Sequence, residues 1–179
     1  MKKRNKALMM VLHITAWAVY IGLLIRTGAI LYSFFVSLFI NPEAAKKLYL
    51  VLNLSELYNY NIGHYIIMMT LVTLISGLKA LIFHWLIKIF LKINLINPFS
   101  REISRLISKI GYIALAVGLL TVIAEAYTKG LIEKGLNLPG LSQNLEGGGE
   151  FLLFAGVIFI IAQVFKRGIE IQTENELTV

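Results

Sequence analysis

The chain contains no cysteine and no aspartate. The lack of cysteine excludes disulfides, thiolate nucleophiles and Cys-ligated metal sites. All ten acidic residues are glutamate, which removes several phosphoryl-transfer and metal-binding motifs that require aspartate. Charged residues are also scarce, at 15% of the chain, where an average soluble domain has about a quarter.

Apolar residues, in contrast, are abundant: 58% of the 179 residues are hydrophobic, and the mean hydropathy is +0.76. This composition indicates a membrane protein, and no stretch resembles a separate soluble domain. The 17 basic residues exceed the 10 acidic ones, but they flank the apolar runs. In that position they act as topology signals and as contacts for anionic lipid headgroups. We therefore expect the bilayer as a partner and no direct nucleic-acid binding.

Four long apolar stretches predict four transmembrane helices in a single domain. Because a helix satisfies its own backbone hydrogen bonds, an all-α integral membrane fold is the natural architecture. The first stretch exceeds the usual length of a signal-peptide core and lacks a cleavage pattern, so we expect it to be a retained span. The predicted spans cover about residues 7–30, 62–92, 105–127 and 150–168, with a C-terminal tail at 169–179.

The first span raises two local questions. Arg26 interrupts its apolar run, and we expect this residue near the outer boundary of the membrane. Asn41-Pro42-Glu43 then has the residues of a helix start, which predicts a short amphipathic helix to about Leu52 in the first outer loop.

The distribution of Lys and Arg predicts the orientation of the spans. The N-terminal tail, the 79–109 connection and Lys166-Arg167 are basic, whereas the other two loops mix Lys with Glu. The positive-inside rule then places both termini in the cytoplasm of a bacterial cell, with the protein in the plasma membrane.

A few polar residues fall within or beside the predicted spans. An ionisable residue at membrane depth is a functional candidate, although each of these side chains can also reach toward the interface. Arg26 and Glu125 fall toward the outer ends of their spans and could pair, with Glu146 and Glu150 as alternative partners for Arg26. The candidates are Arg26, Glu125, Lys79 and His84.

The sequence contains no recognisable set of catalytic or cofactor-binding residues. His13, His64 and His84 do not form a pair with metal-ligand spacing, and no Cys or Asp supports them. The Gly147-Gly148-Gly149 run lacks the residues of a phosphate-binding loop and is typical of a flexible connection. We therefore predict no cofactor, no metal and no enzymatic activity. Ala114 and Gly118 form a small-xxx-small pair that predicts close helix packing.

The sequence ends in RGIEIQTENELTV, which alternates between apolar and acidic residues. Two conformations remain open for it. The favoured one continues the fourth span as a helix, since Gly168 costs a helix only modestly. The other is an extended strand that docks on a partner.

This ending resembles that of a bacterial family of small four-span proteins, known as domain of unknown function 2975. The stretch that leads into the third span is similar too, through Asn97, Phe99 and Ser100, then Leu106, Ile110 and Tyr112. The resemblance implies no catalytic residues. It implies, by gene neighbourhood, a small cytoplasmic helix-turn-helix regulator as partner. The candidate partner-binding residues are Glu170, Glu174, Asn175, Glu176, Leu177, Val179, Asn97, Phe99 and Arg105.

Three functions compete at this point. The first is a membrane sensor or regulatory subunit that binds such a regulator at its cytoplasmic face. The second is a small channel or transporter lined by Arg26, Glu125 and Lys79, which would have to be a homo-oligomer because four short spans enclose little volume. The third is an enzyme that acts on lipid or quinone with His84 or His64 as base, and the sequence supports it least.

Overall fold

The computed structural model describes the backbone of residues 2–49, 52–94 and 98–177 and the side chains of residues 7–49, 52–94 and 98–174. Across these ranges the chain is all-α and has no strand. Four of its helices are long and apolar enough to cross a membrane, which confirms the predicted all-α fold and indicates a multi-pass membrane protein. The elements are α1 (Lys2–Phe39), the 3-10 helix η1 (Pro42–Lys46), α2 (Ser55–Tyr60), α3 (Ile62–Lys92), α4 (Arg101–Glu133), α5 (Leu141–Leu145) and α6 (Gly148–Leu177).

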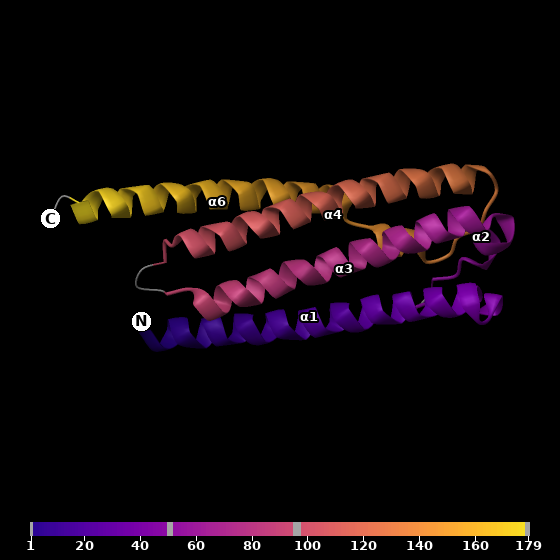
Figure 1. Cartoon of the computed structure of the whole chain (residues 1–179), viewed down its shortest axis with the longest axis horizontal. Helices are drawn as coiled ribbons and strands as arrows, with labels where there is room; N and C mark the ends of the chain where they lie inside the picture. The colour runs from indigo at the N-terminus through magenta and orange to yellow at the C-terminus, as the bar shows by residue number, and fades with distance from the viewer. Residues whose placement is uncertain (1, 50–51, 95–97, 178–179) are drawn as a thin grey trace.

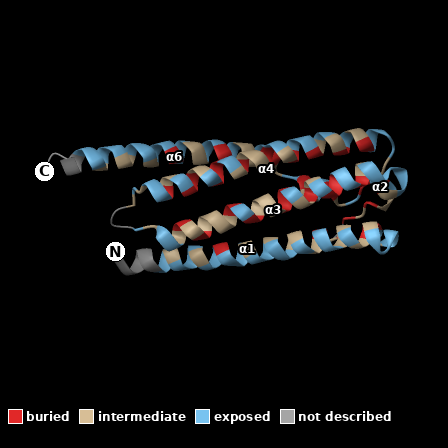
Figure 2. Cartoon of the chain, viewed as in Figure 1, coloured by how far each residue is buried: buried red, intermediate tan, exposed pale blue. Residues whose placement is uncertain are grey.

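The four long helices lie side by side in the order α1, α3, α4, α6 (Figure 1). α3 packs against both α1 and α4, and α4 makes its most extensive contact with α6. The start of α1 and the end of α6 lie at one end of the molecule, here called the terminal end (Figure 1). η1, α2 and α5 lie toward the opposite end, the loop end. Buried residues gather on α3 and α4, whereas α1 is largely exposed, as expected for a helix that faces lipid (Figure 2).

α1 is one uninterrupted helix of 38 residues, so the expected boundary near Arg26 is not a break in the chain. Its second half stays packed on α3 through polar contacts. Thr27 Oγ1 lies 2.8 Å from Ser76 Oγ, and Ser37 Oγ lies 2.5 Å from Tyr65 Oη. Because these contacts lie beyond Arg26, α1 continues along the bundle toward the loop end.

The connection between α1 and α3 differs from the single helix expected from Pro42 to about Leu52. The Asn41 side chain caps η1 by accepting a hydrogen bond of 3.0 Å from the backbone N–H of Glu43. The chain then turns back, and Leu54 N–H donates to the carbonyl of Ala45 at 2.9 Å. Leu54 and Ala45 are fully buried, so apolar burial favours a compact turn over a longer helix.

Small residues of α4 set its close approach to α6. A Cβ at Gly118 would lie 3.0 Å from the backbone nitrogen of Leu152 and 2.7 Å from that residue's Cδ2. Ala114, one turn earlier, is completely buried. The small-xxx-small prediction is therefore confirmed, with α6 as the partner helix.

The connection between α4 and α6 folds back along the bundle. Gly140 and Gly147 bracket α5 and have φ angles of 78° and 98°, in the left-handed region that favours glycine. Leu141 and Leu145 of α5 are fully buried, so this connection packs against the bundle. α6 then begins beside Glu125 of α4. At a rise of 1.5 Å per residue, Glu125 lies about 12 Å along the helix axis before Glu133, the last residue of α4. This fold-back brings polar residues of the connection to the middle of the bundle.

Candidate functional site

The end of the chain is helical. α6 runs without interruption from Gly148 to Leu177 and extends past the other three long helices at the terminal end (Figure 1). The alternative of an extended strand is therefore wrong for the described residues. In a helix Ile169 and Ile171 point to nearly opposite sides, so the alternation in the sequence does not create a single apolar face.

Phe99 fixes where this projecting part begins. Its ring lies against the backbone of Gly168, so closely that a Cβ at residue 168 would lie 2.5 Å from Phe99 Cδ1. The same ring makes an edge contact with Phe165, with 5.3 Å between the centroids. The two stretches that resemble the family most, around Phe99 and after Lys166, are thus in direct contact.

A shallow groove lies next to this contact, between the start of α4 and the end of α6. It has a volume of about 320 Å³ and is here called the tail groove. Its lining residues are Arg101, Ser104, Arg105, Lys166, Ile169 and Glu170. Three of the lining residues are basic, which is typical of water or lipid headgroups rather than of the membrane interior. Ile169 is the apolar residue of the lining.

Two acidic residues of the tail, Glu170 and Glu174, are exposed on α6. Glu170 accepts a hydrogen bond of 2.9 Å from Arg167 Nη1, and both side chains are largely exposed, so this ion pair contributes little to stability. Glu174 follows one turn later and is exposed. After Arg167 the sequence has three Glu and no Lys or Arg, so the charge of α6 changes from basic to acidic at this point.

The remaining candidate partner-binding residues are described only in part or not at all. Asn175, Glu176 and Leu177 belong to the helical backbone of α6, but their side chains lie outside the described set. Asn97 and Val179 lie outside the described residues.

Arg26 has a partner that the sequence did not suggest. Its Nη2 donates a hydrogen bond of 2.8 Å to Asn144 Oδ1 of α5, and the amide of Asn144 donates at 2.7 Å to the carbonyl of Gly140. The suggested contact of Arg26 with Glu125 is not the one observed, nor is one with Glu146 or Glu150. Arg26 Nε is buried and has no hydrogen-bond partner among the described residues.

Lys79 lies on α3 within electrostatic range of Arg26. Its Nζ sits 5.0 Å from the ring centroid of Phe151, an aromatic contact that partly offsets the cost of holding a cation there. Within the described ranges, no carboxylate lies within 4 Å of either cation. The two basic residues therefore form a positively charged centre where α1, α3, α5 and α6 meet.

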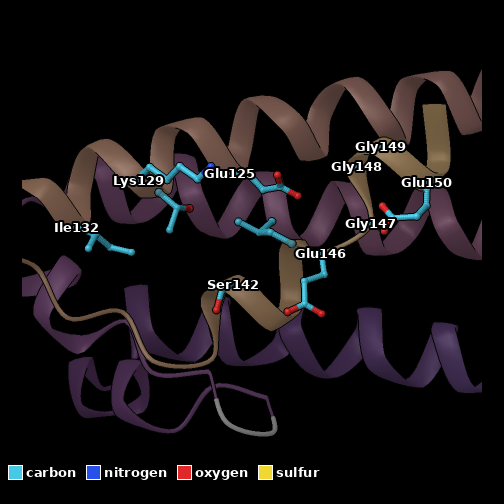
Figure 3. A pocket seen from close by; sticks show the side chains of 11 residues that line it. Glu125, Lys129, Ile132, Ser142, Glu146, Gly147, Gly148, Gly149 and Glu150 are labelled. Carbon is cyan, nitrogen blue, oxygen red and sulfur yellow. The ribbon is translucent and has the colours of Figure 1, made fainter. Parts of the chain in front are cut away.

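Glu125 faces a different region. It lines a cavity of about 590 Å³ between α4 and the start of α6, together with Lys129, Ser142, Glu146 and Glu150 (Figure 3). The triple-glycine backbone forms one wall. Within the part of the chain that the structure describes, no group of three His, Cys, Asp or Glu has the geometry to hold a metal ion.

The comparison with known proteins identifies the family of this chain. A family model described as "Protein of unknown function (DUF2975)" matches residues 15–179, which is most of the chain. The chain belongs to the DUF2975 family. No curated protein and no solved structure matches it.

The histidines of this DUF2975 chain make local contacts. His64 Nδ1 hydrogen-bonds to the hydroxyl of Tyr127, which joins α3 to α4. His13 Nε2 accepts a hydrogen bond of 2.9 Å from Trp17 Nε1, one turn along α1. His84 packs its ring near Tyr20 of α1, with 5.8 Å between the centroids.

Sequence reasoning missed two features of this family member. Asn144 gave no signal, because only the fold-back of the 134–147 connection brings it to Arg26. The second feature is the surrounding of Trp85. In the structure Lys88 and Lys109, from two different helices, both approach its ring to 4.4 Å from the centroid.

Proposed function

We propose that this DUF2975 protein is a membrane regulatory subunit that binds a small cytoplasmic helix-turn-helix regulator through its projecting tail. The observation that carries the proposal is the contact of Phe99 with Gly168. It joins the tail to the start of α4 and holds the exposed end of α6 clear of the bundle. An exposed helix end that carries acidic side chains can bind a basic surface through charge complementarity.

The charges of the tail favour a basic partner. Glu170 and Glu174 are exposed one turn apart on the projecting helix, and Ile171 is 47% exposed beside them. A DNA-binding regulator has a basic surface that these carboxylates would complement. Binding there would compete with DNA, which gives the membrane protein a way to control the regulator.

The proposal requires the terminal end to face the cytoplasm. Its support is the distribution of basic residues, most of which lie on the start of α1, the last two turns of α3, the first turns of α4 and at Lys166-Arg167 of α6. The positive-inside rule then places the terminal end in the cytoplasm and the connections at the loop end outside.

The test is recovery of the tagged regulator with membranes that contain the full-length protein. Deletion of residues 169–179 and the double substitution Glu170→Lys/Glu174→Lys should each abolish recovery. A matched double substitution at the loop end, Glu133→Lys/Glu146→Lys, changes the charge equally and should leave recovery intact. Equal recovery with wild type and both tail variants would sink the proposal.

A second candidate function is a small oligomeric channel or transporter for anions. Arg26 and Lys79 support it, because two cations that have no carboxylate partner among the described residues attract negative charge in an apolar bundle. Purified protein in liposomes should then pass small anions, and an Arg26→Gln/Lys79→Gln variant should not. The absence of any flux in the wild-type protein would eliminate this candidate.

A further inference from the structure

Two lysines from different helices meet at one tryptophan near the terminal end. Lys88 lies one turn after Trp85 on α3, and Lys109 comes from α4. Each ammonium nitrogen is 4.4 Å from the centroid of the Trp85 ring. The ring therefore orients both cations through the same aromatic system and ties the two helices together.

These residues line a groove between α3 and α4 with a volume of about 300 Å³, here called the tryptophan groove. Its polar lining consists of Lys88, Lys92, Arg105, Lys109 and a single acid, Glu102. Lys92 hydrogen-bonds to Glu102, so that one cation is already neutralised. Within the described residues, no carboxylate lies within 4 Å of the other three cations.

The groove sits at the depth where lipid headgroups are expected. It spans the last two turns of α3 and the first turns of α4, where both apolar helices reach their basic ends. A tryptophan flanked by lysines is typical of the membrane interface. Three converging cations at that depth require a counter-anion, and the bilayer itself supplies one in quantity.

We propose that the tryptophan groove is a specific site for the phosphodiester headgroup of an acidic phospholipid. The ammonium groups of Lys88 and Lys109 and the guanidinium of Arg105 provide donors for phosphate oxygens. A zwitterionic headgroup carries its own cation, which these residues would repel. This site is independent of the proposed regulator binding, although Arg105 lines both grooves and so cannot be used to separate them.

Trp85 is a built-in reporter of this site. A Trp17→Phe substitution leaves it as the single tryptophan, since the chain contains two. In nanodiscs, phosphatidylglycerol with brominated acyl chains should quench Trp85 fluorescence more than brominated phosphatidylcholine at the same mole fraction. The double substitution Lys88→Gln/Lys109→Gln should weaken the apparent affinity for phosphatidylglycerol on the order of tenfold or more.

Matched variants make the result specific. Lys129→Gln/Lys134→Gln removes two charges at the loop end and should keep the lipid preference, and Lys88→Arg/Lys109→Arg should keep it as well. Equal quenching of the Trp17→Phe protein by both lipids would overturn the proposal, even if the Gln variant failed to fold. Loss of the preference in millimolar inorganic phosphate would also overturn it, because a small free anion would then be the ligand.

Discussion

The ring of Phe99 covers the backbone of Gly168 and leaves no room for a side chain there. This contact joins the residues just before α4 to the last third of α6. α6 continues beyond this contact as an uninterrupted helix to Leu177.

Gly168→Ala should therefore displace the Phe99 ring. Alanine is the better helix former by about 1 kcal/mol, but the added methyl would meet the ring at a distance that real contacts do not reach. The ring has to rotate away from Phe165, and we expect a net loss of about 1 kcal/mol in the free energy of unfolding. Thermal unfolding in detergent measures this change.

The control is Gly156→Ala on the same helix, where nothing lies within 4 Å of the added methyl. It should stabilise the protein slightly. A Phe99→Ala/Gly168→Ala double variant should regain the stability that the methyl alone removes, relative to Phe99→Ala. If Gly168→Ala and Gly156→Ala behave alike, the Phe99 contact does not hold the tail.

Gly118→Ala should separate α4 from α6. Here the new methyl would meet the backbone nitrogen of Leu152 at 3.0 Å, and a backbone atom cannot rotate out of the way. Overpacking of this kind costs about 1–3 kcal/mol. Gly130→Ala is the matched control on α4, with open space around its Cβ. Equal unfolding midpoints for the two variants, measured by titration with a denaturing detergent, would contradict the packing described here.

The bond between Arg26 and Asn144 should be measurable as a coupling energy. Asn144→Leu leaves the guanidinium without its acceptor, and Arg26→Met removes the donor. A double-mutant cycle should give a coupling of about 1 kcal/mol, within the range found for hydrogen bonds between membrane helices. Purely additive effects on the free energy of unfolding would show that α5 does not hold Arg26.

The orientation of the protein can be read from cysteine labelling, because the native chain has no cysteine that would react. Ser142 is an exposed residue of α5, and Glu174 lies on the projecting end of α6, so each can be replaced by cysteine. A membrane-impermeant maleimide should label residue 142 in intact spheroplasts and residue 174 only after permeabilisation. The reverse pattern would place the termini outside and remove the cytoplasmic partner.

Hydropathy and helix propensity were sufficient to predict the number and type of the long helices, because each apolar run satisfies its own backbone and faces lipid. Close helix packing at Gly118 was also predicted, since small residues one turn apart let another helix approach. That α6 is this helix came from the structure. The contact of Arg26 with Asn144 was not predicted. It depends on a long connection that folds back onto the bundle. Three glycines with positive φ allow its turns, but the sequence does not show in which direction the connection folds.

The tail shows a similar limit. The alternation after Gly168 suggests a strand, whereas the helix of span 4 continues through it because glycine interrupts a helix at only modest cost. The groove at Trp85 needed the structure as well. Lys88 is its neighbour on the same helix, but Lys109 comes from the next helix and reaches the ring only through the packing of α3 on α4.

The central claim is that the exposed end of α6 binds a cytoplasmic regulator. A photoreactive amino acid at position 174 in living cells, followed by mass spectrometry of the crosslinked products, tests it most directly. The same residue at position 133, on the loop end, provides the control. The account predicts a helix-turn-helix protein crosslinked from position 174 and absent from position 133. Crosslinks from position 174 only to lipid or to other copies of this chain would contradict it.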